Sequence, residues 1–388
     1  MVTAKINYKI RILKTLQDIE QYRAVWQKML DSEPYPAINA DINRYLSVLK
    51  ASENKPNPLI LLLEQNDHPK AMVIGRREKI SIPVRLGYKT IFKPKLNAMT
   101  VVYGGILGQP DKNISLLLIK ELKKLLKRKG IAIDVVYFNH LEVDSIFYRQ
   151  LRKKNSFVRY NHFPINEPHW IIEIPDSVDE FEASLSRKRR GEFRRLIKKL
   201  RKNNGDKLEI KEFHIMNEVE IFLNIAKSIS KQSFKNSINA GLKNDSVTKQ
   251  CIFKDVNLNR WWGRIMFVAG EPCAYVSGSK YHNIFFIETI GYDTRWASYS
   301  PGKLLLYEIF KLYSGKGDIA IFDFGFGDAE YKKRFCRKTW LEAKATYVFS
   351  PSAYPLLINL ICSLNSAITV ALIWIAQKTG IYQLIKRK

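Results

Sequence analysis

A short segment of chemically distinctive residues, Ser300-Pro301-Gly302, separates a strand-like stretch from an apolar stretch with helical spacing. Ser300 is a good N-cap residue, and Pro301 suits the first helical position because its missing N–H is not needed there. Gly302 lets a ligand approach the backbone, and Lys303 adds a positive charge. Free N–H groups and the positive end of the helix dipole therefore predict an anion-binding pocket. The alternative is that the segment only begins a helix.

A second polar segment follows the next strand-like stretch, where Asp323 and Asp328 flank the turn Phe324-Gly325-Phe326-Gly327. A carboxylate at a strand end beside aromatic residues can have a raised pKa and act as a general base. Asp323 is therefore a candidate base, and Asp328 stands at the other end of the same turn. The alternative is that Asp323 caps the turn or pairs with Lys332 or Arg334.

The elements that must position these residues form two similar series. The order strand, helices, antiparallel strands, helix, strand, helix, strand occurs in each half of the chain. We therefore expect two α+β units of the same type. The polar segments lie in the second half, so we expect the chemistry there. The strands predicted for that half are at 208–213, 264–268, 274–279, 284–290, 319–324 and 343–349.

The composition excludes a disordered chain and indicates anionic partners. Apolar residues make up 46% of the 388 residues, enough for the cores of two or three domains. The 64 Lys and Arg against 37 Asp and Glu give a formal charge of +27. This charge favours phosphorylated small molecules, nucleic acid or an anionic membrane face, and it does not choose among them.

Cysteine and histidine usage favours a cytoplasmic protein without a metal site. The four cysteines are far apart and show no CxxC, so we interpret them as reduced thiols. The six histidines show neither HxH nor HExxH spacing, so we expect no metal. The basic, polar start of the sequence has no apolar core of signal-peptide length, and we infer no secretion.

A strongly basic helix is predicted from Leu185 to Lys202. Its apolar residues form one helical stripe, and the remaining surface carries many Lys and Arg with one acid, Glu192. Like charges one turn apart destabilise a helix by a few tenths of a kcal/mol each. We therefore favour an anion-binding helix over a solvated outer face. The expected anion-binding residues are Arg187, Arg189, Arg190 and Arg194, together with Lys332 after the polar turn.

The C-terminal stretch Pro355 to Ala376 contains no charged residue and nearly matches a bilayer span in length. Its polar residues gather on one side of a helix, and basic residues flank both ends, at Lys378 and at Lys386-Arg387-Lys388. We rank an interfacial or subunit-packing helix first, a helix that covers the second domain next, and a true span third. Peripheral membrane contact through 355–376 is thus expected.

Two separated motifs carry a resemblance to a known family. The segments YDTRWASYSPGKLLL and FDFGFGDAEYKKRF resemble the C-terminal signature of the CelD/BcsL acetyltransferase family, a branch of the GNAT superfamily. Upstream, SLSRKRRGEFRRLIKKLRK resembles the basic segment of that family. The resemblance covers about residues 10 to 349. It implies an α+β fold of two tandem GNAT-like domains with mixed, mostly antiparallel sheets, related to the FemABX transferases. The expected divisions are 1–176, the basic helix 177–205, the catalytic domain 206–350, and the apolar helix and basic tail 351–388.

The resemblance also implies acyl transfer from a thioester, with acyl-CoA as co-substrate. In GNAT proteins the donor's pantetheine lies along a splayed strand, and its pyrophosphate caps the next helix. Tyr331 is then a candidate to protonate the leaving thiolate, and Glu288 is a second candidate base beside Asp323. GNAT proteins commonly carry Arg/Gln-x-x-Gly-x-Gly/Ala before that helix, whereas this chain has Arg295 and a single Gly302. The donor-binding residues implied are Ile287, Thr289, Ile290, Arg295, Ser300, Pro301, Gly302 and Lys303.

These observations lead to one expected function and two alternatives. The first is a cytoplasmic, membrane-associated acyltransferase that acts on an amine or hydroxyl of a polysaccharide precursor, since the family is linked to cellulose and exopolysaccharide production. The second is a FemABX-like aminoacyltransferase that uses aminoacyl-tRNA. The third is a non-catalytic GNAT-like protein that binds an anionic membrane or nucleic acid.

Overall fold

The computed structural model divides the chain into two compact units, residues 1–167 with 341–388 and residues 168–340. The predicted basic tail at 386–388, and the ends of two predicted elements at Gly205 and Phe349, lie outside the described residues. The structure describes residues 8–86, 89–126, 131–153, 159–160, 164–204, 208–232, 245–336, 338–348, 350 and 352–379.

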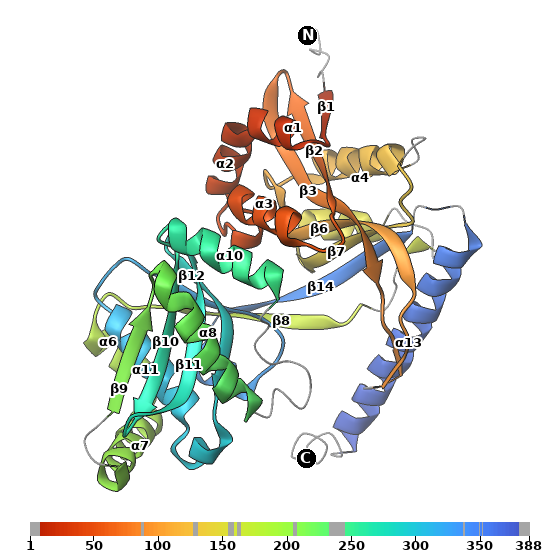
Figure 1. Cartoon of the computed structure of the whole chain (residues 1–388). Helices are drawn as coiled ribbons and strands as arrows, with labels where there is room; N and C mark the ends of the chain where they lie inside the picture. Colours follow the sequence, from red (N-terminus) through yellow and green to blue (C-terminus); the bar gives the residue numbers. More distant parts are fainter. Residues whose placement is uncertain are drawn as a thin grey trace. The chain divides into compact units, whose positions relative to one another are not determined.

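The first unit is a mixed sheet covered by helices (Figure 1). Its strand order is β1-β2-β3-β6-β7-β14, in which only β6 and β7 are parallel. The strands are β1 (Tyr8–Leu13), β2 (Asn57–Gln65), β3 (His68–Ser81), β6 (Lys95–Leu107), β7 (Val135–Glu142) and β14 (Lys338–Val348), with a hairpin of β4 (Val84–Leu86) and β5 (Lys89–Phe92). The helices are α1 (Leu16–Gln21), α2 (Arg23–Asp31), η1 (Ile38–Ala40), α3 (Ile42–Ala51), α4 (Lys112–Leu126), α5 (Ile146–Lys153) and α13 (Ala353–Lys378).

The second unit repeats this plan. Its strand order is β9-β10-β11-β12-β13-β8, in which only β12 and β13 are parallel. The strands are β8 (Asn166–Glu173), β9 (Leu208–Phe213), β10 (Trp261–Val268), β11 (Glu271–Tyr281), β12 (Ile284–Tyr292) and β13 (Ile321–Phe326). The helices are α6 (Val178–Ser184), α7 (Arg187–Asn204), α8 (Met216–Lys231), α10 (Ser246–Asn257), η3 (Thr294–Tyr299), α11 (Pro301–Tyr313) and α12 (Glu330–Phe335).

The two repeats exchange their last strands. In each unit the parallel pair is followed by an antiparallel strand that comes from the other repeat, β14 beside β7 in the first unit and β8 beside β13 in the second. The predicted α+β fold with mixed, mostly antiparallel sheets is confirmed. The predicted divisions at 1–176 and 206–350 are each continuous in the sequence. The first compact unit is not, because it combines residues 1–167 with residues 341–388.

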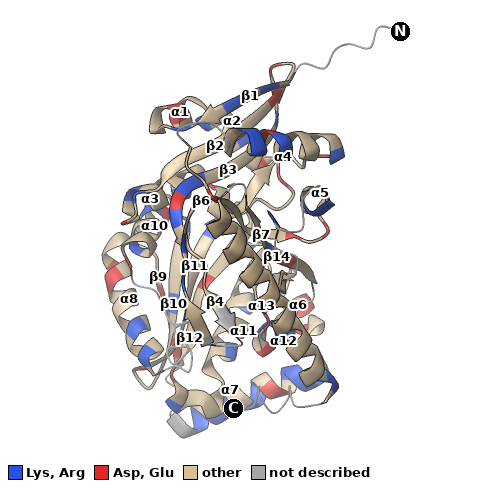
Figure 2. Ribbon diagram, turned by 90° about the vertical axis from the view of Figure 1, so that its right-hand side faces the viewer, with Lys and Arg blue, Asp and Glu red and all other residues tan. Residues whose placement is uncertain are grey.

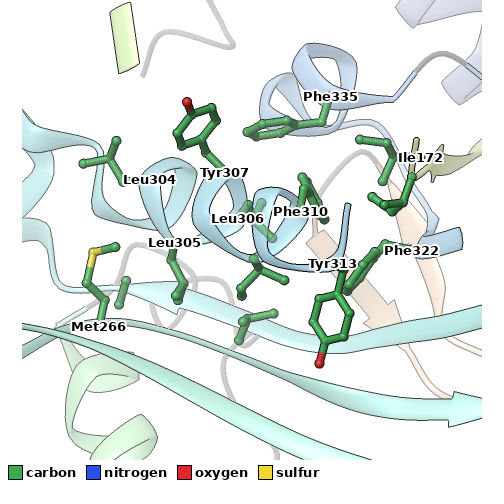
Figure 3. Close-up of a cluster of buried hydrophobic side chains, with 14 of the residues drawn as sticks. Ile172, Met266, Leu304, Leu305, Leu306, Tyr307, Phe310, Tyr313, Phe322 and Phe335 are labelled. Atoms are coloured by element: carbon green, nitrogen blue, oxygen red, sulfur yellow. The ribbon is translucent and has the colours of Figure 1, made fainter. Parts of the chain in front are cut away.

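The core of the second unit forms on both faces of its sheet because strand side chains alternate. Trp261 and Ile265 of β10 pack with α8, whereas Trp262 and Met266 pack with α11. Figure 3 shows the α11 side, where leucines and aromatic residues of this helix lie against the sheet. Phe310 of α11 lies 5.0 Å, centroid to centroid, from Phe322 of β13. Helix α11, which follows the Ser-Pro-Gly segment, therefore packs on both the strand before it in the sequence, β12, and the strand after it, β13.

Candidate functional site

Strands β12 and β13 pair at one end and separate at the other. Their parallel register runs from Ile284–Ile321 to Phe286–Asp323. β12 then continues to Tyr292, and β13 continues to Phe326. Within the described strands, the backbone of β12 after Phe286 has no β13 partner. The two parallel strands therefore separate beyond Phe286, next to the residues predicted to hold the donor.

A β-bulge marks the same part of β12. Thr289 pairs with Ser277 and Ile287 pairs with Gly278, so Glu288 is an extra residue on this strand. Its side chain is exposed. A Cβ added at Gly278 would lie 1.9 Å from the carbonyl oxygen of Phe286, so only glycine permits this close approach. Bulges of this kind often re-aim side chains next to active sites.

The N-terminus of α11 carries no side-chain cap. Ser300 has left-handed backbone angles, φ 50 and ψ 50, and its hydroxyl accepts no hydrogen bond from the first turn. Ser300 therefore occupies the predicted N-cap position, but its side chain forms no capping hydrogen bond. Instead, the carbonyl oxygen of Ser300 accepts hydrogen bonds from the N–H groups of Lys303 (3.0 Å) and Leu304 (3.1 Å). Pro301 occupies the first helical position as predicted.

Gly302 is not required by the fold. A Cβ built on it would lie 3.5 Å from Cδ1 of Tyr292, which is ordinary van der Waals contact. The same contact shows that the end of β12 adjoins the start of α11. The predicted donor residues of the strand and of the helix start are therefore neighbours in space.

Lys303 brings a partly desolvated cation to this helix start. Burial lowers the pKa of its ammonium, and the nearby Arg334 guanidinium lowers it further. Glu192 and Glu330 act in the opposite direction but do not prevail. An anion bound here would therefore meet an ammonium that solvent screens less than usual.

Arg295 is held by Asp293 at the end of β12. Its Nε and Nη2 donate to Oδ2 of Asp293 at 2.9 Å and 2.7 Å, while the side chain stays 60% exposed. Burial raises the pKa of Asp293, but the hydrogen bonds from Arg295 outweigh this effect and keep the pKa below its ordinary value. The predicted donor-binding role of Arg295 stays a prediction, with its guanidinium fixed at the rim.

The first unit provides an internal comparison. Its parallel strands β6 and β7 also stop pairing early, after Val101–Phe138, although β6 runs on to Leu107. However, the start of α4 is capped, because Oδ1 of Asp111 accepts the N–H of Ile114 at 2.8 Å. A carboxylate in this position repels a second anion. The uncapped helix start belongs to the second unit, where the chemistry is predicted.

Asp323 is buried against a histidine that the sequence did not single out. Its Oδ1 lies 2.9 Å from Nε2 of His169 on β8 and also accepts the N–H of Gly325. His169 stacks on Trp340, with ring centroids 4.3 Å apart. The alternative that Asp323 caps the following turn is thus confirmed, and the side chain that contacts its carboxylate is His169. His169 contacts Asp323 because its strand, β8, pairs with β13. The spacing of residues in the sequence does not predict this pairing.

The remaining predicted residues of the polar turn have separate surroundings. Asp328 forms an ion pair with Lys333, with Oδ2 and Nζ 2.9 Å apart. Lys332 is buried, and its ammonium donates to the carbonyl oxygens of residues 325–327 at 2.9–3.2 Å. The lysine holds the turn in place, and its anion-binding role stays a prediction. Burial raises the pKa of Tyr331 to about 12, and the Cys336 thiol adds to this effect. Tyr331 is therefore a protonated phenol at neutral pH.

Helix α7 is the predicted basic helix, and it packs beside the helix start described above. Phe193 of α7 stacks on Tyr307 of α11 with centroids 4.4 Å apart, and the Lys199 ammonium lies 5.0 Å from the ring centroid of Tyr299 in η3. Figure 2 shows Lys and Arg gathered around this helix. Lys199 therefore lies close to the residues that precede α11.

The four predicted arginines of α7 divide into two kinds. Arg189 donates to the carbonyl oxygen of Arg334, and Arg190 donates to that of Glu182 at 2.9 Å. Arg187 and Arg194 are exposed and line a groove of about 520 Å³. The other groove residues are Asp179, Glu182, Ala183, Arg190 and Gly191.

The separated parallel strands and the uncapped helix start define a GNAT-type acyltransferase domain. Residues 187–333 match the family model described as an acetyltransferase (GNAT) domain, of the CelD/BcsL type. The predicted GNAT superfamily is thereby confirmed for this part of the chain. A GNAT domain suggests an enzyme and implies acyl-CoA as co-substrate.

Solved structures share the fold over most of the chain. The structure is similar to FemX with a TM-score of 0.60 and 11% identity, over 90% of this chain and 100% of that one. It is similar to a tandem GNAT protein from the clavulanic acid biosynthesis pathway with a TM-score of 0.51 and 9% identity, over 89% and 100%. It is also similar to a Bacteroides thetaiotaomicron protein of unknown function, with a TM-score of 0.51 and 12% identity, over 88% of this chain and 100% of that one. These likenesses concern the fold alone. No curated protein matches the chain.

Proposed function

We propose that the protein transfers an acyl group from acyl-CoA to an amine or hydroxyl of a polysaccharide precursor. One observation carries the donor part of the proposal. β12 separates from β13 after Phe286 and leads directly to the start of α11, which has no side-chain cap. A strand that separates from its parallel neighbour, next to a helix start where the N–H of Gly302 and the helix dipole face a ligand, suits a long donor that ends in phosphates.

The donor is held by backbone groups and one lysine. The donor lies along Ile287 to Ile290 of β12, beyond the last pair that β12 forms with β13, and a backbone N–H of this segment stabilises negative charge on the thioester oxygen. The first turn of α11 and Lys303 hold the pyrophosphate. Gly302 lets the phosphates approach the backbone, which agrees with a glycine where the fold has room for a side chain.

Proton transfer is assigned from the exposure of each candidate. Glu288 stands at the bulge with an exposed side chain, so it can reach an incoming amine or hydroxyl and accept its proton. Asp323 is only 2% exposed and is engaged by His169, so it acts as a positioning residue for the end of β13. Tyr331, protonated at neutral pH, donates a proton to the leaving thiolate.

The acceptor class rests on the resemblance to the CelD/BcsL family and on the basic groove. Exposed Arg187 and Arg194 on α7 suit the phosphate of a nucleotide-linked or lipid-linked sugar. Asp179 and Glu182 of α6, which also line the groove, suit hydroxyl groups of the same sugar.

The test is a thermal-shift titration with acetyl-CoA and CoA. A ligand that binds only the folded state stabilises it by RT ln(1 + [L]/Kd), about 2.7 kcal/mol at a hundredfold excess over Kd. We expect a saturable shift that Gly302→Asp abolishes. The matched control is Asn113→Asp, which places the same charge at the second residue of α4. No shift in the wild type, or an equal loss in both variants, would overturn the proposed donor site.

A second candidate function keeps the fold and changes the donor to aminoacyl-tRNA. The observation in its favour is the exposed basic surface of α7 next to η3 and α11, which exceeds what a single CoA molecule requires. Copurification of tRNA that is removed by high salt, together with no thermal shift in CoA, would favour this donor.

A further inference from the structure

Helix α13 is attached to the first unit along one face of its first half. Pro355, Ile358 and Asn359 are buried, and Ile358 packs against Leu96 and Val348. The Asn359 amide donates to a backbone carbonyl at 3.3 Å. These partners lie in the first compact unit, and one of them, Val348, comes from the segment 206–350 that was predicted as the second domain. The opposite face is apolar and faces solvent.

The second half of α13 leaves the body of the unit. Val370 and Trp374 stand three turns beyond Asn359 and Ser363 on the same helical face. The earlier pair is buried and the later pair is exposed, at 45% and 56%. Ile368, Leu372 and Ile375 on the other face are exposed as well. Figure 2 shows α13 almost free of charged residues. A helix that exposes apolar residues all round is typical of a membrane-facing segment.

A second exposed apolar element lies beside this helix in the first unit. The β4–β5 hairpin packs against α13 and carries exposed Ile91 and Phe92. Exposed Lys93 follows directly after them in the chain, and exposed Lys95 follows after Pro94. Apolar side chains flanked by lysines are the pattern of an interfacial anchor, in which the cations stay at the level of the lipid headgroups.

We propose that α13 and the β4–β5 hairpin form one lipid-docking surface that binds an anionic bilayer and lies in its interface. We call it the anchor surface and define it by Ile91, Phe92, Leu372, Trp374 and Ile375. This inference goes beyond the proposed acyl transfer and does not depend on it.

The packing of α13 distinguishes an interfacial anchor from a span. α13 is long and apolar enough, by length and composition, to cross a bilayer. Its first half is fixed to the sheet, so only Ala367–Lys378 is available for insertion, and this segment is about 18 Å long at 1.5 Å per residue. A hydrocarbon core is about 30 Å thick. The available segment is therefore too short to cross, and it inserts at the boundary of headgroups and acyl chains.

The charges favour a lipid surface over a second copy of the chain. Residues 353–377 contain no acid and no base, and the exposed charges next to the hairpin are lysines. The whole chain carries +27, so two copies repel each other, whereas an anionic lipid surface attracts each of them.

The experiment measures binding of the full chain to vesicles of phosphatidylcholine with and without phosphatidylglycerol. We expect binding that needs phosphatidylglycerol and weakens with salt. Leu372→Glu with Trp374→Glu, and separately Phe92→Glu, should each weaken it by about tenfold or more, because each removes apolar burial in the interface. The matched control is Ile221→Glu, an exposed isoleucine on α8 of the second unit. Because the replaced side chains are exposed, the thermal midpoint of every variant should stay at the wild-type value.

Three outcomes would overturn the proposal. The first is vesicle binding that Phe92→Glu and the α13 variant leave unchanged. The second is no vesicle binding together with a wild-type oligomer that the α13 variant dissociates, which would assign the surface to a second copy. The third is resistance of the membrane-bound protein to a carbonate wash, which would indicate a span instead of an interfacial helix.

Discussion

Oδ1 of Asp323 lies 2.9 Å from Nε2 of His169, and both side chains are at most 2% exposed. Asp323 is the last residue of β13 that pairs with β12, so this contact stands where the two parallel strands separate. His169 belongs to β8, the strand that the second unit receives from the first repeat. The exchanged strand therefore helps to fix the geometry of the site that the second repeat forms.

The first prediction concerns the position of Asp323. Asp323→Asn keeps the shape of the side chain and removes the charge that His169 and Gly325 face. We expect the free energy of unfolding to fall by about 1–3 kcal/mol, the cost of a disrupted buried hydrogen bond. His169→Gln should give a similar fall, and the double variant should cost less than the sum of the two. Urea denaturation of the four proteins measures this. Additive costs would show that the two side chains do not act together.

The second prediction separates Glu288 from Asp323. Glu288→Gln should lower kcat by about 10²–10⁴-fold, as for loss of a general base, with the thermal midpoint unchanged because the side chain is exposed. The control is Glu271→Gln, an exposed carboxylate on the neighbouring strand. The opposite result would be a normal kcat in Glu288→Gln and a large loss of kcat in Asp323→Asn, measured where that variant is fully folded. This result would assign the general base to Asp323.

The fold was predictable because its signals are local. Strand alternation, helical apolar spacing and the turns between them are set by neighbours in the sequence, and the α+β repeats follow from their order. The exchange of β8 and β14 was not predictable, because an apolar strand pattern does not show which sheet the strand joins. The contact of His169 with Asp323 joins residues 154 positions apart and depends on that exchange.

The candidate site was predictable where it is formed by the ends of backbone elements. Ser300-Pro301-Gly302 indicated a helix start next to a strand, and the structure places both together. The left-handed conformation of Ser300 was not predictable, because serine prefers the extended N-cap conformation in isolation. The engagement of Lys332 by backbone carbonyl groups also depends on the folded turn.

The third prediction concerns Tyr331 as the proton donor. Because burial and Cys336 raise its pKa to about 12, the phenol should stay protonated across the working pH range. Tyr331→Phe keeps the ring against Phe324 and removes the hydroxyl, so kcat should fall by about 10²-fold or more with little change in KM. Steady-state kinetics from neutral to alkaline pH measure this. A loss of wild-type kcat that follows an ionisation far below the raised pKa would contradict the assignment.

The fourth prediction is a pH dependence of donor binding. Lys303 is charged below its pKa, which burial and Arg334 lower. Its contribution to phosphate binding should therefore be complete well below that lowered pKa and should disappear as the pH rises through it. Calorimetric titration with 3′,5′-ADP, which lacks a thiol, measures this. Lys303→Arg should bind without the pH dependence, since guanidinium stays charged, and Lys303→Gln should bind weakly throughout. An identical pH profile in all three proteins would remove Lys303 from the site.

The fifth prediction tests the groove on α7 with charge-matched variants. Arg189 and Arg190 donate to backbone carbonyl groups, so their replacement would disturb the fold as well as the surface. Arg187→Gln with Arg194→Gln removes two charges from the groove and leaves those contacts intact. Arg195→Gln with Lys198→Gln removes two exposed charges of the same helix outside the groove. We expect the first pair to weaken binding of a nucleotide-linked sugar by about tenfold or more, because each charge-assisted hydrogen bond contributes more than a neutral one. The second pair should weaken binding only by lowering the overall positive charge of the helix, and added salt should remove this effect. Equal weakening by both pairs would show that α7 attracts anions without forming a defined acceptor site.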